Sequence, residues 1–201
     1  RDVRGFMRGL LWVAGIAGAI ILLLNLFVFD SWVVPHAEDK GFETSILPTL
    51  KAEDRILLRK GSTPRYTELA RCQHPTNSSR YVVGRVFGEP GDRVEINDLR
   101  VTTNGRSTSA AHGCGEMMVA HPATGNLITM SCGVVETGSW SFQFLNAQTG
   151  LSAGVHSALV EAGKVFLVSD NRLLHEDSRD FGQVDSSTCE HIVYRLWGEH
   201  Y

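Results

Sequence analysis

Four cysteines are the first residues of this chain whose type and number indicate chemistry. They are Cys72, Cys114, Cys132 and Cys189. An even number of cysteines favours disulfides in an oxidising compartment, and four cysteines allow three pairings. We expect Cys114 to pair with Cys132, because both fall in one predicted insertion, about residues 101–162.

A metal site is the alternative chemistry for two of these cysteines. Its ligands would be His112, Cys114, His121 and Cys132. That spacing lacks the close ligand pairs of structural zinc sites. The sequence therefore predicts no metal and no other cofactor, and an exported metal-binding module is the weakest of the functions considered.

Three further segments combine turn-forming residues with polar ones. Residues 45–50 read Ser-Ile-Leu-Pro-Thr-Leu, and residues 84–92 read Gly-Arg-Val-Phe-Gly-Glu-Pro-Gly-Asp. The third segment begins with Ser-Asp-Asn-Arg at residues 169–172 and continues with Asp-Ser-Arg at residues 177–179. Each segment taken alone is an ordinary loop or turn. Their order along the chain carries more information than any one of them.

An apolar stretch precedes all three segments. Gly9–Phe29 is interrupted by one polar residue, Asn25, and is long enough to cross a hydrocarbon core of about 30 Å as a helix. A buried core helix would need a polar face, which this stretch lacks. A cleaved signal peptide would be shorter and would end in a small-x-small pattern, which the exit from Phe29 does not show. We therefore predict a retained transmembrane helix over residues 9–29.

Charges on either side of this helix predict its orientation. Arg1, Arg4 and Arg8 precede it, whereas Asp30 and Glu38 are the first charged residues after it. The positive-inside rule places residues 1–8 in the cytoplasm and residues 30–201 outside it. The sequence thus predicts a single-pass protein of the inner (cytoplasmic) membrane with a periplasmic or otherwise extracytoplasmic domain.

The exported part is predicted to be mostly β, because short apolar runs alternate with turn residues. The expected strands are Arg55–Arg59, Tyr81–Phe87, Arg93–Ile96, Leu127–Met130, Trp140–Leu145, Val165–Val168 and His191–Trp197. We expect an antiparallel, partly closed β fold with a smaller inserted β region at about 101–162. The net charge of −3 over 201 residues argues against nucleic acid as a partner.

Behind an apolar N-terminal stretch, the three segments in this order resemble the type I signal peptidase family. The family's segments look like S-M-x-P-T-L, K-R-x-x-G-x-P-G-D and G-D-N-R followed by D-S-R. The resemblance extends from the apolar stretch to about Val184, apart from the insertion. It implies a signal-peptidase-like β fold and an enzyme that cleaves secretory preproteins at the outer surface of the membrane in which it is anchored. Its catalytic groups would be a serine nucleophile and a neutral lysine base.

Matching by position carries the family's roles onto this chain. Ser45 falls at the nucleophile, and four charged residues fall at the family's supporting positions: Arg85, Asp170, Asp177 and Arg179. The lysine position is Gly84, which has no side chain, so the base is missing. Lys51 lies six positions beyond Ser45, but its charged surroundings would keep it solvated and protonated.

Two other positions depart from the family. Glu43 stands where the family often has a serine that completes the oxyanion hole, and a carboxylate there would repel a developing oxyanion. His175 stands where a serine supports the lysine. Residues 36–44 also form an apparent insertion before Ser45, where the family runs almost directly from proline to serine.

Two functional hypotheses follow. The leading one is a pseudopeptidase that lacks the lysine base and serves as a binding or structural subunit of a membrane complex. Its partners would be the lipid bilayer, preprotein signal peptides or other subunits. The alternative is an active serine endopeptidase that cleaves signal peptides of exported preproteins, with Ser45 as nucleophile and His175 as a substitute base near Asp177.

Overall fold

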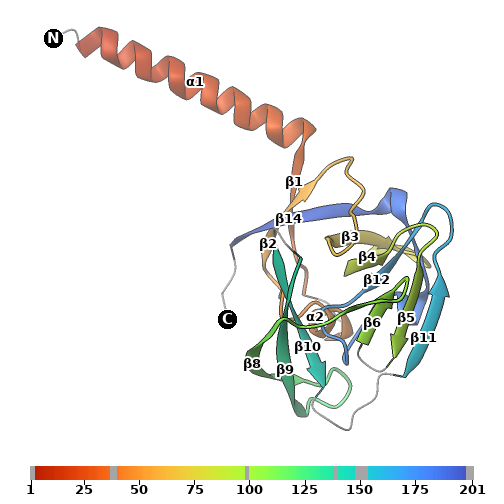
Figure 1. The fold of residues 1–201 in the computed structure, drawn as a ribbon. Coiled ribbons are helices and arrows are strands. Elements are labelled where there is room, and N and C mark those ends of the chain that lie inside the picture. The colour runs from red at the N-terminus through yellow and green to blue at the C-terminus, as the bar shows by residue number, and fades with distance from the viewer. Residues whose placement is uncertain (1–2, 37–39, 98–99, 138–139, 148–153, 198–201) are drawn as a thin grey trace.

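The N-terminal helix stands apart from the β domain in the computed structural model, which describes residues 3–36, 40–97, 100–137, 140–147 and 154–197 (Figure 1). Helix α1 is Val3–Phe27, and its apolar part, Gly5–Phe27, has a mean hydropathy of 2.4 with none of it buried against the protein. The predicted apolar helix at residues 9–29 is therefore present, although it begins earlier and ends two residues sooner. Its length is sufficient to cross a membrane.

The first pair of strands holds the end of this helix. Strand β1 (Phe29–Val33) follows α1 directly and pairs antiparallel with β2 (Arg55–Arg59). From the end of β2, the Lys60 ammonium donates to the carbonyl oxygens of Asn25 (3.0 Å) and Leu26 (3.3 Å). These are carbonyls of the last helical turn, which have no partner within a helix, so Lys60 caps α1.

The main sheet has the strand order β1-β2-β14-β3-β4-β12-β13 within the described residues. Its remaining strands are β3 (Leu69–His74), β4 (Asn77–Gly88), β12 (Lys164–Val168), β13 (Val184–Asp185) and β14 (Glu190–Trp197). All the pairings are antiparallel. In β2, Ile56 and Leu58 are fully buried while their neighbours are not, as expected for a half-buried strand.

Two smaller sheets lie between β4 and β12 in sequence. One has the order β11-β5-β6-β7, with β5 (Arg93–Asn97), β6 (Arg100–Thr103), β7 (Arg106–Thr108) and β11 (Val155–Leu159). The other has the order β10-β9-β8, with β8 (His112–Ala120), β9 (Leu127–Glu136) and β10 (Ser141–Ala147). The predicted mostly β, antiparallel fold is confirmed. Each predicted strand overlaps one of these strands, and several strands were not predicted.

Short helices were also missed. They are α2 (Lys40–Ser45), α3 (Ser178–Phe181) and the 3-10 helix Ser186–Thr188. Helices of one or two turns carry too little periodicity to stand out in a sequence. Helix α2 is held by packing: Phe42 is buried with Ile46, Leu50 and Val83 in one apolar cluster.

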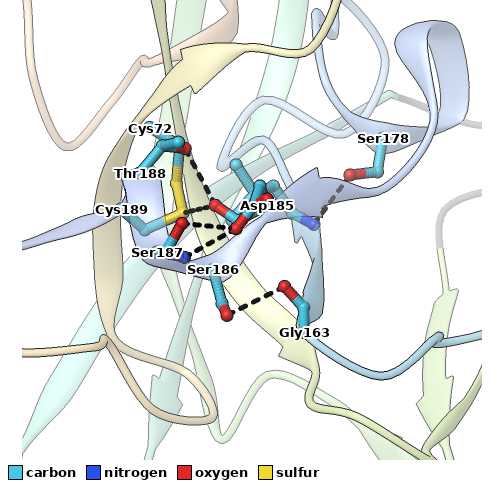
Figure 2. Close-up of a disulfide and its surroundings, with 9 residues drawn as sticks. Cys72, Gly163, Ser178, Asp185, Ser186, Ser187, Thr188 and Cys189 are labelled. Atoms are coloured by element: carbon cyan, nitrogen blue, oxygen red, sulfur yellow. Dashed lines mark hydrogen bonds between the residues drawn. A yellow bond between two sulfur atoms is a disulfide. The ribbon is translucent and has the colours of Figure 1, made fainter.

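Two disulfides cross-link the β domain. Cys114 pairs with Cys132 across β8 and β9, which confirms the predicted pair. Cys72 of β3 pairs with Cys189, the residue directly before β14, beside the turn in which the Asp185 carboxylate accepts from the backbone and hydroxyl of Ser187 (Figure 2). The alternative metal site is wrong, because a disulfide removes the thiolates of Cys114 and Cys132 that would bind the ion.

Candidate functional site

Ser45 is the last residue of α2 and is completely buried. Its hydroxyl donates to the carbonyl oxygen of Phe42, three residues earlier, at 2.8 Å. Serine commonly bonds back to its own helix in this way. Within the described residues, no histidine, lysine or carboxylate hydrogen-bonds to the Ser45 hydroxyl. The side chain is therefore engaged with backbone and shielded from solvent.

The third segment fixes the backbone around Ser45. The Asn171 backbone N–H donates to the Ser45 carbonyl (3.2 Å), and the Asn171 side-chain amide donates to the Thr44 carbonyl (3.0 Å). The Thr49 hydroxyl donates to the Asp170 carboxylate at 2.5 Å. Segments more than a hundred positions apart in sequence thus meet at the serine. Asn171 and Thr49 were quoted in the sequence segments, but no role was predicted for them.

Arg85 and Asp170 form a buried bidentate ion pair. The Arg85 Nε lies 2.9 Å from Oδ1 of Asp170, its Nη2 lies 2.6 Å from Oδ2, and its Nη1 donates to the Thr67 carbonyl at 3.0 Å. The side chains are 3% and 1% exposed. The guanidinium also lies 4.0 Å above the ring of Phe142 in β10. The planar guanidinium group matches the two oxygens of a carboxylate and, once paired with them, needs few other partners.

Asp177 and Arg179 form a second buried pair. Arg179 donates from Nε to Oδ1 of Asp177 (2.9 Å) and from Nη2 to Oδ2 (2.7 Å), while Asp177 also caps α3. The Ser169 backbone N–H donates to the same carboxylate at 2.8 Å. Burial alone would raise the pKa of Asp177, but the hydrogen bonds and charge of Arg179 outweigh it and lower the pKa below its ordinary value.

Arg172 completes this buried framework, and sequence reasoning missed its importance. It is 3% exposed, and its guanidinium carbon lies 4.7 Å above the ring of Phe87 and 5.5 Å above that of Phe144. Burial lowers the pKa of Arg172 to about 10. Its Nη1 is buried without a hydrogen-bond partner in the described part of the chain. The sequence feature that could have indicated a buried role for Arg172 was its position directly after Asp170-Asn171.

His175 hydrogen-bonds to Asp180, not to Asp177 as the hypothesis of a substitute base required. Its Nδ1 lies 2.8 Å from Oδ2 of Asp180, which also accepts the Asp177 backbone N–H at 2.9 Å. The expected orienting role of Asp177 is wrong because both of its carboxylate oxygens already accept from Arg179. Ligand atoms of these three residues come within 4.8 Å of one another, but the same pairing with Arg179 leaves Asp177 a poor metal ligand.

Gly84 lies buried in β4, opposite Ala70 of β3. A Cβ atom there would lie 3.1 Å from the Cβ of Leu167 and 3.5 Å from the carbonyl oxygen of Val168. A longer side chain would therefore need a small shift of β12 against β4. Two of the lysines are used elsewhere, since Lys60 caps α1 and Lys164 lies 3.9 Å from Asp185.

Glu43 points its carboxylate at a histidine of the preceding segment. Its Oε1 lies 3.0 Å from Nδ1 of His36, whose Nε2 lies 3.2 Å from Oε1 of Glu53. Hydrogen bonds to Glu43 and then to Glu53 raise the pKa of His36, because the protonated ring can donate to both carboxylates. The predicted insertion at residues 36–44 thus includes His36 and most of α2, whereas residues 37–39 lie outside the described residues.

The structure thus places a mostly β domain after an apolar helix, with a serine turn beside two buried Arg–Asp pairs, and comparisons with known proteins identify the family. The family model described as "Signal peptidase, peptidase S26" matches residues 7–196, so the chain belongs to this family. It is 26% identical to signal peptidase I of Bacillus caldolyticus over 196 residues, covering 94% of this chain and 91% of the relative.

Two further comparisons agree in name. The chain is 26% identical to signal peptidase IB of Staphylococcus aureus over 197 residues, covering 92% of this chain and 88% of the relative. Among solved structures, a signal peptidase I from Enterococcus faecalis aligns with 66% of this chain and 98% of its own length, at 24% identity and a TM-score of 0.39.

Proposed function

We propose that this protein is a pseudopeptidase of the signal peptidase family that serves as a binding or structural subunit of a membrane complex. One observation carries the proposal: Ser45 is completely buried and its hydroxyl donates to the Phe42 carbonyl, with no base beside it among the described residues. A serine hydroxyl is a weak nucleophile until a base accepts its proton. Gly84, at the position that matches the family's lysine, has no side chain to do so.

The oxyanion position supports the same proposal. Glu43 matches the position of the family's oxyanion-hole serine, and its carboxylate is an acceptor rather than a donor. A negative charge near a developing oxyanion raises the energy of the transition state. Loss of the base alone costs several orders of magnitude in rate, and Glu43 would add to that loss.

The proposal includes the membrane topology. Gly5–Phe27 would cross the bilayer, the N-terminal arginines would lie in the cytoplasm, and the β domain would lie outside. A reporter that is active only in the cytoplasm, fused after Tyr201, should be silent, whereas the same reporter fused before residue 1 should be active. Strong activity of the C-terminal fusion would show that the β domain lies in the cytoplasm and would contradict the proposed orientation.

An active peptidase is the second candidate, and two observations favour it. The relatives that match over nearly the whole chain are named signal peptidases. His175 is hydrogen-bonded to a carboxylate, that of Asp180, which is how a carboxylate orients a catalytic histidine in serine hydrolases. In this candidate, α2 would have to move so that Ser45 reaches solvent and His175.

Cleavage of a preprotein decides between the two. The full-length chain in liposomes is incubated with a preprotein that carries an Ala-x-Ala site, beside Ser45→Ala, His175→Ala and, as a control at an exposed serine, Ser78→Ala. We expect the parent and all variants to be equally inert at every pH from 5 to 9. Cleavage by the parent that Ser45→Ala abolishes and Ser78→Ala preserves would overturn the pseudopeptidase proposal.

A further inference from the structure

A groove opens on the side of the β domain where β14 separates from β3. These strands pair only through Glu190 and His191, opposite Arg71 and Ala70. From Ile192 onward β14 pairs only with β2, while Leu69, the first residue of β3, pairs with Arg85 of β4. A groove of about 840 Å³ lies between the diverging strands. Its walls are Leu69 of β3, Ile192–Arg195 of β14 and Trp140–Gln143 at β10. Ser45, Gly84 and His175 do not line it.

The outer edge of β10 faces this groove with unpaired backbone groups. Leu145 uses that edge, because its N–H donates to the Asp170 carbonyl (2.8 Å) and its C=O accepts from the Arg172 N–H (2.9 Å). Alternate residues of a strand direct their N–H and C=O to the same edge, so Gln143 and Ser141 share the edge of Leu145. Neither of these two residues hydrogen-bonds along that edge to any described residue. An open edge of this kind is a template for another strand.

Uncompensated charge in the groove is acidic. Its two arginines are engaged, Arg85 with Asp170 and Arg195 with Asp54 at 3.3 Å. No arginine or lysine of the described residues is paired with its two carboxylates. Glu68 accepts from the Arg65 backbone N–H (2.8 Å) and lies 3.7 Å from His191, and Glu136 lies 3.7 Å from His112.

The state of His191 adds to this acidity. Burial lowers the pKa of His191, so at neutral pH its ring is uncharged and leaves the charge of Glu68 uncompensated. Trp140 and Tyr194, which are 37% and 65% exposed, add flat apolar surface to the same groove.

We propose that this groove binds an extended basic polypeptide segment, which adds to the outer edge of β10 as a further strand. Backbone groups of Ser141 and Gln143 would bond to the segment, and lysine or arginine side chains would meet Glu68 and Glu136. Strand addition of this kind takes affinity from main-chain hydrogen bonds and specificity from alternate side chains. The inference rests on the proposed binding role and names the partner class for it.

Charge recognition is tested with two labelled hexapeptides and the full-length chain in detergent micelles. One peptide alternates lysine with valine, and the other alternates glutamate with valine. We expect the lysine peptide to bind at least tenfold more tightly. The double variant Glu68→Gln with Glu136→Gln should weaken that binding about tenfold, whereas Glu95→Gln, an exposed glutamate of β5 outside the groove, should not change it. Equal binding of the two peptides would overturn the proposal.

Strand addition is tested by N-methylating alternate amides of the lysine peptide. Only one of the two alternating sets faces β10, so one set of methyl groups should weaken binding at least tenfold and the other less than twofold. Ser141→Pro should match the stronger effect, because it removes an N–H from the open edge and leaves the β9 ladder intact. Equal effects of both sets would contradict strand addition. So would the finding that the protein forms dimers and that the peptide dissociates them.

These outcomes separate the two proposals. If the peptide binds equally well whichever set of amides is methylated, the groove inference is wrong, and the pseudopeptidase proposal is unaffected. If the protein cleaves a preprotein and the cleavage depends on Ser45, the pseudopeptidase proposal is wrong. The peptide measurements then still test whether the groove binds a basic segment.

Discussion

Two groups of residues meet around Ser45, and they differ in how completely their polar atoms are satisfied inside the protein. The buried framework, Arg85–Asp170 and Asp177–Arg179, is made of bidentate pairs with side chains at most 4% exposed. The candidate catalytic positions have other partners: Ser45 bonds to backbone, and His175 bonds to Asp180, whose side chain is 44% exposed. Removing a framework residue would leave a buried charge, whereas removing a side chain at a candidate catalytic position would not. The framework therefore has a structural reason to persist that is independent of catalysis.

The largest expected effect comes from breaking a framework pair. Asp170→Ala leaves the Arg85 guanidinium and the Thr49 hydroxyl buried without their partner, and should lower the free energy of unfolding by about 3–5 kcal/mol. Urea unfolding of the full-length chain in micelles measures this loss.

The control for that pair replaces both charges. The double variant Arg85→Met with Asp170→Leu removes both charges together, so it should lose clearly less stability than Asp170→Ala. A double variant that is no more stable than Asp170→Ala would show that the cost does not come from the orphaned charge.

The next effect concerns access to the nucleophile position. A thiol in Ser45→Cys is the only free one, because the four native cysteines are in disulfides. Since Ser45 is completely buried, α2 must open before a maleimide can react. We expect labelling about a hundredfold slower than for Ser78→Cys at an exposed position, which corresponds to an opening free energy of about 3 kcal/mol. Comparable rates for the two thiols would show that the serine is accessible in solution.

Acid should weaken the framework through Asp177. Its folded-state pKa is lowered, so its contribution to stability is fully present above the unfolded value of 3.8 and is lost as the pH falls through the folded value. Asp177→Asn should therefore cost about 2 kcal/mol at pH 7, by loss of charged hydrogen bonds, and less below pH 4. Unfolding measured from pH 7 to pH 3 checks this convergence, and a constant difference across that range would contradict it.

The smallest effect should come from the candidate catalytic positions themselves. His175→Ala removes a hydrogen bond to a partly exposed carboxylate and should change stability by less than about 1 kcal/mol. Thermal unfolding of the His175→Ala and Asp170→Ala variants under the same conditions compares their losses of stability directly. A loss as large as that of Asp170→Ala would place His175 within the framework.

The sequence predicted the elements whose signals are local. The apolar stretch after Arg8 and the short apolar run Arg55–Arg59 were recognisable because length and composition belong to the segment itself. The Cys114–Cys132 pair was also predicted correctly. Helix α2 was missed because its six residues have no clear period, and the burial of Phe42 and the hydrogen bonds from Asn171 hold it in place through distant segments.

Sequence alone determined the family, the absence of a side chain at Gly84 and the charge at Glu43, because residue identity needs no coordinates. It could not determine that Ser45 is sealed from solvent or that His175 bonds to Asp180. Both depend on which of several nearby carboxylates and carbonyls the folded backbone brings within about 3 Å of the side chain. The groove beside β10 likewise exists only because β14 leaves β3 after two residue pairs. Strand divergence is set by packing between distant segments, so the tertiary structure decided it.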